Sequence, residues 1–250
     1  MAELLQARSF PSRNGSFVTT HWSVVLLAGQ DGKVPEAREA FARVYLDYWY
    51  PLYAYTRRRG YEPANAEDIT QDFFVHLMEK KSLQGLQQFG GRFRSFLLRS
   101  LNNFLANDWD RNHAQKRGNG LPGLSLNVDD GEAKYSLAAL DRDTPESLFE
   151  RQWVVTLLAK VFETLRQECE MGGKARLFED LRLHLQGDRQ GPAYAEIAAR
   201  HGLSEGAVKV TVHRLRHRYG ELLREEIART VSSPAEVDEE LRHLISLTAR

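Results

Sequence analysis

Six basic side chains fall on one side of a predicted helix near the carboxyl end of this chain. The segment 194–219 reads YAEIAARHGLSEGAVKVTVHRLRHRY, and the six side chains are Lys209, His213, Arg214, Arg216, His217 and Arg218. Cations gathered along a helix are the electrostatic pattern expected for contact with nucleic-acid phosphates. A helix whose basic face is simply hydrated shows the same pattern, so the surrounding residues must decide between the two interpretations.

Those surrounding residues favour two short helices that meet at a sharp turn. Gly202 suits the positive φ angle that such a turn requires. Ser204 is placed to cap the second helix, and Glu205 falls in its first turn, where the helix dipole favours an anion. The expected buried positions, spaced as helices require, are Ile197, Ala198, Val208, Val212, Leu215 and Tyr219. The combination predicts a DNA-binding helix-turn-helix.

A second stretch with binding chemistry covers 92–111, with the sequence RFRSFLLRSLNNFLANDWDR. Aromatic rings stack on unpaired bases, arginines hold the backbone, and amide side chains bond to base edges. Helical spacing assigns Phe96, Leu97, Leu101 and Phe104 to a core, which is the alternative use of such residues. The side chains that we expect to contact single-stranded DNA are Arg94, Arg99, Asn102, Asn103, Asn107, Trp109 and Arg111.

Catalysis finds little support in the sequence. Asp68, Asp72 and His76 are spaced to share one helix face, and a carboxylate–histidine metal site there is conceivable. A solvated acidic face explains the same residues more simply. No HExxH, P-loop, GxSxG or CxxC motif is present. We therefore expect no enzyme activity, no cofactor and no metal, and keep a metal-dependent enzyme as the least favoured hypothesis.

The elements that must position these residues are all helical, because apolar residues recur at helical spacing and strand-type alternation is not sustained anywhere. We expect a helix from Pro35 that Pro51 kinks or splits, and a cluster of arginines before Gly60 that ends it. A further helix begins around Thr144 and Pro145. The other expected helices cover 64–80, 93–111, 174–185, the helix-turn-helix, and a last segment that starts at 233–234.

Glycine, proline and acidic residues between 119 and 145 predict a break in this pattern, and Gly131 is among those expected to prevent regular structure. The fold class expected is therefore all-α, with two helical domains joined by a flexible acidic linker. The predicted parts are an N-terminal arm (1–33), a first domain (34–118), the linker (119–145), a second domain with the helix-turn-helix (146–229) and a C-terminal helical extension (230–250).

Composition limits the class of protein. The 250 residues are 42% hydrophobic and carry zero formal net charge, so DNA contact must come from local patches rather than a general affinity for polyanions. The single cysteine, Cys169, excludes an internal disulfide and fits a reducing compartment. No segment has the length or the apolar character of a membrane span or a signal peptide. We expect a soluble cytoplasmic protein with no membrane insertion.

Three segments, in order, carry a family resemblance: AEDITQDFFVHLM (66–78), the arginine-rich stretch 92–111, and the helix-turn-helix 194–218. With this order and separation, the chain resembles the extracytoplasmic-function (ECF) class of bacterial RNA polymerase sigma factors over 34–118 and 146–225. The resemblance implies that 34–118 is sigma domain two, which binds core RNA polymerase and recognises and melts the minus-ten promoter element. It also implies that 146–229 is sigma domain four, which reads the minus-thirty-five element.

The resemblance also assigns roles to residues. Asp68, Gln71 and Asp72 would bind the polymerase, and Asn103 matches the asparagine usual at a pocket that captures an unstacked base. The minus-thirty-five contacts would come from Ser204, Glu205, Lys209, Val210, Thr211, His213, Arg214 and Arg218.

Some positions depart from the family pattern. Phe96 stands where a tryptophan is common, and Val210 and Thr211 stand where a small polar residue and an arginine are frequent. Apolar contact with thymine methyl groups would then replace part of the base readout. The sequence leaves open whether an anti-sigma factor or another regulator also binds, and whether the two terminal extensions regulate the protein or only cap its domains.

A stand-alone helix-turn-helix regulator, which binds duplex DNA without polymerase, is the alternative function. It accounts for the C-terminal half of the chain and leaves 93–111 unexplained.

Overall fold

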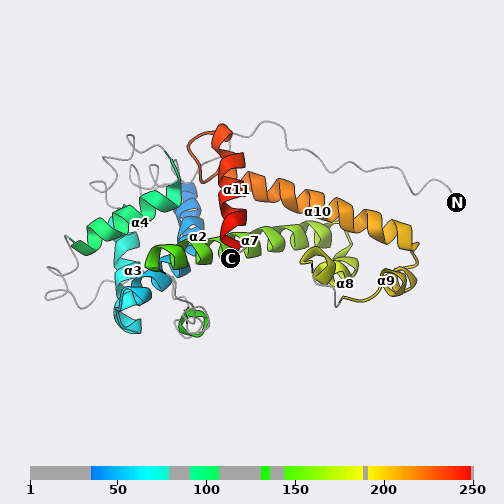
Figure 1. Cartoon of the computed structure of the whole chain (residues 1–250), viewed down its shortest axis with the longest axis horizontal. Helices are drawn as coiled ribbons and strands as arrows, with labels where there is room; N and C mark the ends of the chain where they lie inside the picture. The colour runs from blue at the N-terminus through cyan, green and yellow to red at the C-terminus, as the bar shows by residue number, and fades with distance from the viewer. Residues whose placement is uncertain (1–34, 79–90, 107–130, 136–143, 188–190, 249–250) are drawn as a thin grey trace.

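The structure is a computed structural model that describes residues 35–78, 91–106, 131–135, 144–187 and 191–248 (Figure 1). Every regular element within these ranges is helical, which confirms the all-α prediction for the described part of the chain. The N-terminal arm and the residues Asn107, Trp109 and Arg111 lie outside it. The elements are α2 (Pro35–Arg58), α3 (Pro63–Met78), α4 (Phe93–Phe104), α7 (Pro145–Met171), α8 (Ala175–Leu185), α9 (Tyr194–His201), α10 (Glu205–Ala228), η4 (Pro234–Glu236) and α11 (Val237–Thr248).

Two helix boundaries follow the expected chemistry. Thr144 caps α7 by accepting a hydrogen bond from the Ser147 amide at 3.2 Å, and Pro145 takes the first helical position. Gly60, with a φ angle of 97°, follows the arginines that end α2. Local capping and glycine signals in the sequence therefore locate these ends correctly.

Pro51 does not split α2, which continues through it from Pro35 to Arg58. A proline inside a helix removes one backbone hydrogen bond and is disfavoured in isolation. Here Tyr48 and Leu52, on either side of Pro51, are both fully buried in the same core. Packing along the whole helix offsets the lost hydrogen bond, so the predicted split was wrong, while a kink at Pro51 stays a prediction.

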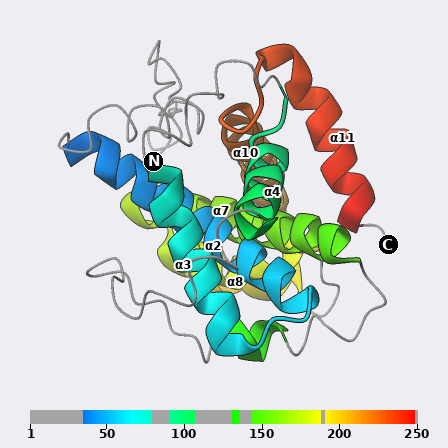
Figure 2. The same ribbon diagram turned by 90° about the vertical axis from the view of Figure 1, so that its left-hand side faces the viewer.

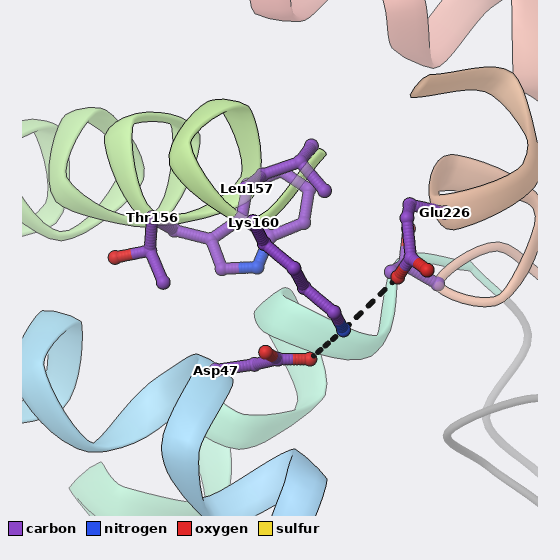
Figure 3. Close-up of a pocket in the computed structure, with 7 residues that line it drawn as sticks. Asp47, Thr156, Leu157, Lys160 and Glu226 are labelled. Atoms are coloured by element: carbon purple, nitrogen blue, oxygen red, sulfur yellow. Dashed lines mark hydrogen bonds and ion pairs between the residues drawn. The ribbon is translucent and has the colours of Figure 1, made fainter. Parts of the chain in front are cut away.

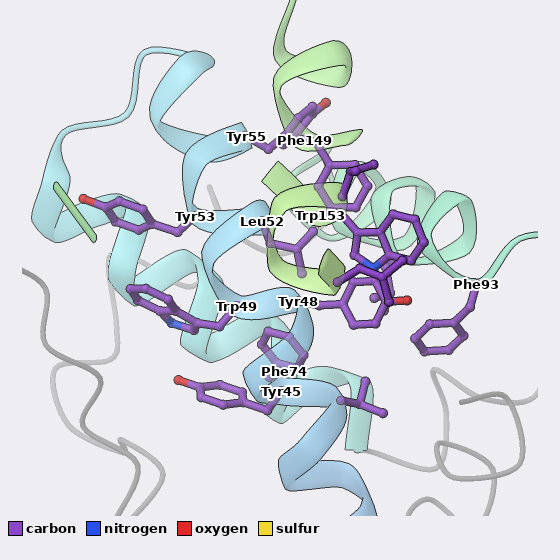
Figure 4. Close-up of a cluster of buried hydrophobic side chains, with 14 of the residues drawn as sticks. Tyr45, Tyr48, Trp49, Leu52, Tyr53, Tyr55, Phe74, Phe93, Phe149 and Trp153 are labelled. Carbon is purple, nitrogen blue, oxygen red and sulfur yellow. The ribbon is translucent and has the colours of Figure 1, made fainter. Parts of the chain in front are cut away.

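The long helix α7 is the centre of the fold (Figures 1 and 2), because it contacts α2 along one part and α10 along another. Its Trp153 ring stacks on Tyr48 of α2 at 6.2 Å between centroids, and Phe149 meets the edge of Tyr55 at 6.5 Å (Figure 4). The same core includes buried residues of α3, α4, α10 and α11. The helices assigned by sequence to two separate domains thus share one hydrophobic core.

Charged side chains fix α10 antiparallel to α7. The Lys160 ammonium of α7 lies 2.6 Å from Asp47 of α2 and 3.0 Å from Glu226 of α10, beside a cavity of about 10 Å³ (Figure 3). Farther along, Arg218 of α10 forms a two-pronged pair with Glu168 of α7, at 2.8 and 2.9 Å. These pairs set how α10 lies along α7.

Part of the predicted linker is ordered on α2. Residues 131–135 form a short helix, so the expectation that Gly131 prevents regular structure was wrong. A β-carbon at Gly131 would come within 3.3 Å of the Trp49 ring, so glycine allows this close approach. Glu132 accepts hydrogen bonds from Arg57 at 2.7 and 3.0 Å and from the Tyr53 hydroxyl at 2.7 Å.

The predicted C-terminal helix is present as η4 and α11. Leu244 of α11 is buried, and α11 contacts both α7 and α10. None of the described helices combines the length and the hydropathy needed to cross a bilayer.

The junction of α2, α7 and α10 generates a stability prediction. Lys160→Met should lower the free energy of unfolding near neutral pH by about 2 kcal/mol, because two largely buried carboxylates lose their shared cation. Arg166→Met, which removes an exposed ion-pairing cation from the same helix, should cost well under half as much. Urea titrations at neutral pH measure both changes.

The deficit in Lys160→Met should shrink as the pH falls toward about 5. Burial raises the pKa of Asp47 and Lys160 lowers it, so removing Lys160 raises this pKa further. A carboxyl with a raised folded-state pKa binds protons more tightly in the folded state, so its contribution to stability falls as pH rises through that window. A deficit that stays constant between the two pH values would contradict the assignment.

Candidate nucleic-acid interface

The turn between α9 and α10 has the backbone geometry that its sequence predicts. Gly202 adopts the left-handed conformation, with φ 63° and ψ 31°, and the amide of Leu203 donates to the carbonyl of Ala198 at 2.9 Å. Ser204 then caps α10, because its hydroxyl accepts a hydrogen bond from the Ala207 amide at 3.1 Å. The two helices are therefore joined by a short turn with defined ends.

A small core of its own holds this turn in place. It is made by buried side chains of α8, α9 and the first half of α10, namely Leu181, Ile197, Ala198, Val208 and Val212. The four predicted members from α9 and α10 are thus confirmed as buried. Leu215 is half-buried against this core, whereas Tyr219 packs against the main core. The first turns of α10 consequently project from the end of the molecule (Figure 1).

The outer face of α10 exposes most of the residues predicted to read duplex DNA. Lys209 pairs with Glu205 at 2.6 Å, both at least half exposed, and this contact raises the pKa of Lys209. Val210 is 49% exposed on the same face. His213 and Arg214 are exposed, and neither has a hydrogen-bond or ion-pair partner within the described ranges.

Thr211 is half-buried, and its hydroxyl donates to the Ala207 carbonyl at 2.8 Å. This hydroxyl is therefore engaged by the backbone of its own helix.

Arg218 corrects one sequence prediction. Its guanidinium contacts Glu168 of α7 and also Glu221 and Glu225 of α10, at 3.0 and 3.2 Å for the last two. These carboxylates raise the pKa of Arg218 above its usual value, Glu168 having the largest effect. A cation surrounded by three carboxylates serves the α7–α10 contact rather than DNA. Helical spacing showed its place on α10 but not the acids of α7 opposite it.

The structure buries Arg94, where the sequence predicts a contact with single-stranded DNA. Its side chain is only 1% exposed and is enclosed by Glu240 of α11, Glu150 of α7 and the Trp153 ring, which lies 4.8 Å from the guanidinium carbon. Burial lowers the pKa of Arg94 to about 10, which still leaves it charged at neutral pH. In this structure Arg94 cannot reach a DNA strand, because α11 covers it.

The remaining predicted contacts on α4 separate into two groups. Arg99 and Asn103 are exposed, whereas Asn102 is half-buried. The Asn102 side-chain carbonyl accepts hydrogen bonds from the Tyr55 hydroxyl at 2.8 Å and from Arg59 at 2.6 Å. Asn102 therefore ties α4 to the end of α2, and the described part of the predicted single-strand surface is reduced to Arg99 and Asn103.

The acidic face of α3 is exposed as predicted. Asp68 and Asp72 face solvent, and the Gln71 amide donates to Glu67 at 2.9 Å. Burial and the neighbouring Asp68 charge raise the pKa of Glu67. Within the described ranges, no three histidine, cysteine or acidic residues gather closely enough to hold a metal ion, and the His76 ring packs against Phe104 at 5.3 Å.

Sequence reasoning missed Asp180 of α8, which positions α9. Its carboxylate lies 2.6 Å from Arg200 and 2.7 Å from the His201 ring, at the C-terminal end of α9. Both partners sit next to Gly202, so Asp180 fixes the helix that precedes the turn. Only the three-dimensional contact identifies it, because it lies on a different helix and belongs to no motif.

No family model, no curated protein and no solved structure matches this chain.

The turn makes a specific prediction about two glycines. Gly202→Ala should lower the free energy of unfolding by about 1–2 kcal/mol, because a side chain disfavours the left-handed conformation even where space is free. Gly220→Ala, in the interior of α10 with open space around it, should raise stability by about 0.5–1 kcal/mol. Urea unfolding compares the two variants, and equal effects would argue against the turn geometry.

Proposed function

We propose that this protein is a promoter-specificity factor of the ECF sigma type, which binds core RNA polymerase and directs transcription initiation. The observation that carries the DNA-binding part is the projecting face of α10, where Arg214, His213 and Val210 are exposed beyond a separately packed turn. An α-helix of this kind fits the major groove of duplex DNA. The α9–turn–α10 unit would then act as the helix-turn-helix that reads the minus-thirty-five element.

The polymerase-binding part rests on α3 and on the motif resemblance. Asp68 and Asp72 are charged and exposed, and a protein surface with basic residues is the complementary partner. α3 and α9 lie toward opposite ends of the molecule (Figure 1). Polymerase and duplex DNA could therefore engage this chain at the same time without competing for one surface.

Exposed residues at the end of α4 support a role near the minus-ten element. Asn103 is exposed near the C-terminal end of α4, and Arg99 is exposed one turn earlier. An exposed amide can bond an unstacked base while an arginine holds the adjacent phosphate. This part of the proposal depends on the resemblance more than the duplex-binding part does.

A stand-alone duplex-binding regulator is the second candidate, and the burial of Arg94 favours it. With Arg94 covered and Asn102 bonded to α2, the described surface for single strands is small. Such a regulator would need only α10 and would bind its operator without polymerase.

Run-off transcription with purified core polymerase decides between the two candidates. Templates from a random promoter library should yield a protein-dependent product that shares common sequence elements. Tight binding of the free protein to a defined duplex, with no product in the transcription assay, would reject the sigma assignment in favour of the stand-alone regulator.

The face of α10 makes a prediction about salt dependence. Arg214→Ala should weaken promoter binding by the holoenzyme and lower the slope of log K against log salt by about one unit, because one phosphate contact is lost. Arg224→Ala is the matched control, since Arg224 is an exposed arginine of the same helix, 3.7 Å from Asp238 and outside the proposed interface. Fluorescence anisotropy over a range of salt concentrations gives both slopes. An unchanged slope for Arg214→Ala would remove this arginine from the phosphate contacts.

A further inference from the structure

The N-terminal end of α4 is covered by a chain segment from the far end of the sequence. The Phe93 amide donates to the Thr230 carbonyl at 2.8 Å. The Ser232 hydroxyl accepts from the Gly91 amide at 2.5 Å and donates to the Gly91 carbonyl at 2.8 Å. Residues 229–248, here called the C-terminal cover, continue from these contacts into α11.

A carboxylate of this cover sits among the arginines at the start of α4. Glu240 of α11 is 1% exposed, pairs with Arg94, and lies 2.5 Å from Nε of Arg92. The neighbouring Glu239 is 73% exposed and reaches Arg92 only at 3.9 Å. Of the two adjacent glutamates, Glu240 alone is therefore inserted between the two arginines.

The charged side chains at this site come from the start of α4, from α7 and from α11. The cations are Arg92 and Arg94, and the anions are Glu240 from α11 and Glu150 from α7, which lies 3.7 Å from Nε of Arg94. His243 of α11 lies 3.4 Å from Glu150. The two arginines thus face one buried carboxylate, Glu240, the partly exposed Glu150, and at the rim the exposed Glu239.

The buried guanidinium of Arg94 retains hydrogen-bonding capacity. Its Nε and Nη2 atoms have no hydrogen-bond partner, although the side chain is almost completely enclosed, and Oε2 of Glu240 beside it has none either. Unpaired buried donors are uncommon and unfavourable. α4 also begins without a side-chain cap, so its N-terminus adds a positive dipole to the same place. Glu240 therefore leaves two donors of Arg94 unpaired, and these donors are available to the oxygens of a phosphate once the carboxylate is displaced.

We propose that Arg92, Arg94 and the start of α4 form a site for a nucleic-acid backbone phosphate, and that Glu240 fills it as an internal competitor. The inference rests on the proposed function, because it names how DNA contact at α4 is regulated. Docking of the C-terminal cover and contact between Arg94 and a DNA strand exclude each other. The structure is thus a closed form of the protein, and nucleic acid binds at this site only after the cover moves away.

The attachment of the cover is consistent with such a movement. It buries Val231 and Leu244 and packs the partly exposed Val237, Leu241 and Leu247 on the core, while Asp238, Glu239 and Ile245 remain exposed. A helix as short as α11 is marginally stable by itself, so it remains helical mainly through its docked face. Removing the charge that holds it at α4 should therefore loosen the cover without unfolding the shared core.

The test compares Glu240→Gln with Glu239→Gln in binding to a fluorescein-labelled oligothymidine, measured by anisotropy with the full-length protein. Glu240→Gln should bind at least about fivefold more tightly than wild type, because the open form becomes more populated. Glu239→Gln removes the same charge from an exposed neighbour and should bind as wild type does. The double variant Arg94→Met with Glu240→Gln should lose the gain, because the phosphate ligand is gone.

Equal affinities of wild type and both single variants would overturn the proposal, as would a gain that persists in the double variant. Hydrogen exchange on the wild-type protein gives a second measurement that does not depend on the folding of a variant. Amides of 237–248 should lose protection when oligothymidine saturates the protein, and unchanged protection in the bound protein would also overturn it.

The binding assay and the transcription assay together distinguish a failure of the phosphate site from a failure of the proposed function. A gain for Glu240→Gln with no promoter-dependent transcription by any variant supports the phosphate site and rejects the sigma assignment. Promoter-dependent transcription with no gain for Glu240→Gln rejects the phosphate site and leaves the sigma assignment intact.

Discussion

The packing of α7 against α2 is the contact on which the rest of the structure depends. Tyr48 and Trp153 meet in the middle of it, and both are almost completely buried. Since α7 also contacts α8, α10 and α11, every described element of the second half of the chain is connected to α2 through this one helix or its neighbours. Buried aromatic area of this kind contributes strongly to stability, so α7 joins the two halves as a rigid element.

This arrangement divides the basic residues between two tasks. Arg94 and Arg218 are used inside the molecule, where carboxylates of α7, α10 and α11 surround them. Arg214 and His213 remain exposed at the end of α10. A zero net charge is therefore compatible with DNA binding, because the acidic residues neutralise the internal arginines and leave the projecting face positive.

Local features of the fold could be read from the sequence with good accuracy, because they depend on neighbouring residues. The cap at Ser204, the left-handed Gly202 and the buried positions Val208 and Val212 all follow from helical spacing and turn chemistry. The continuation of α2 through Pro51 could not be read in this way, since packing against distant residues compensates for the local cost.

The candidate site was harder to predict than the helices, for the same reason. Spacing marks Arg94 and Arg218 as polar positions on their helices, but it does not show that Glu240 and Glu168 approach them from other helices. Both errors concern long-range ion pairs between residues far apart in the sequence. The exposure of Arg214, by contrast, could be predicted from its position on α10 alone, because it lies on the opposite side of the helix from the buried Val208 and Val212.

Permanganate footprinting of promoter DNA tests the central claim most directly, namely that this chain brings polymerase to a promoter and holds separated strands. With core polymerase and the protein together, thymines of the minus-ten region should become reactive, while either component alone leaves them protected. Thymine reactivity that is the same with and without the protein would contradict the account.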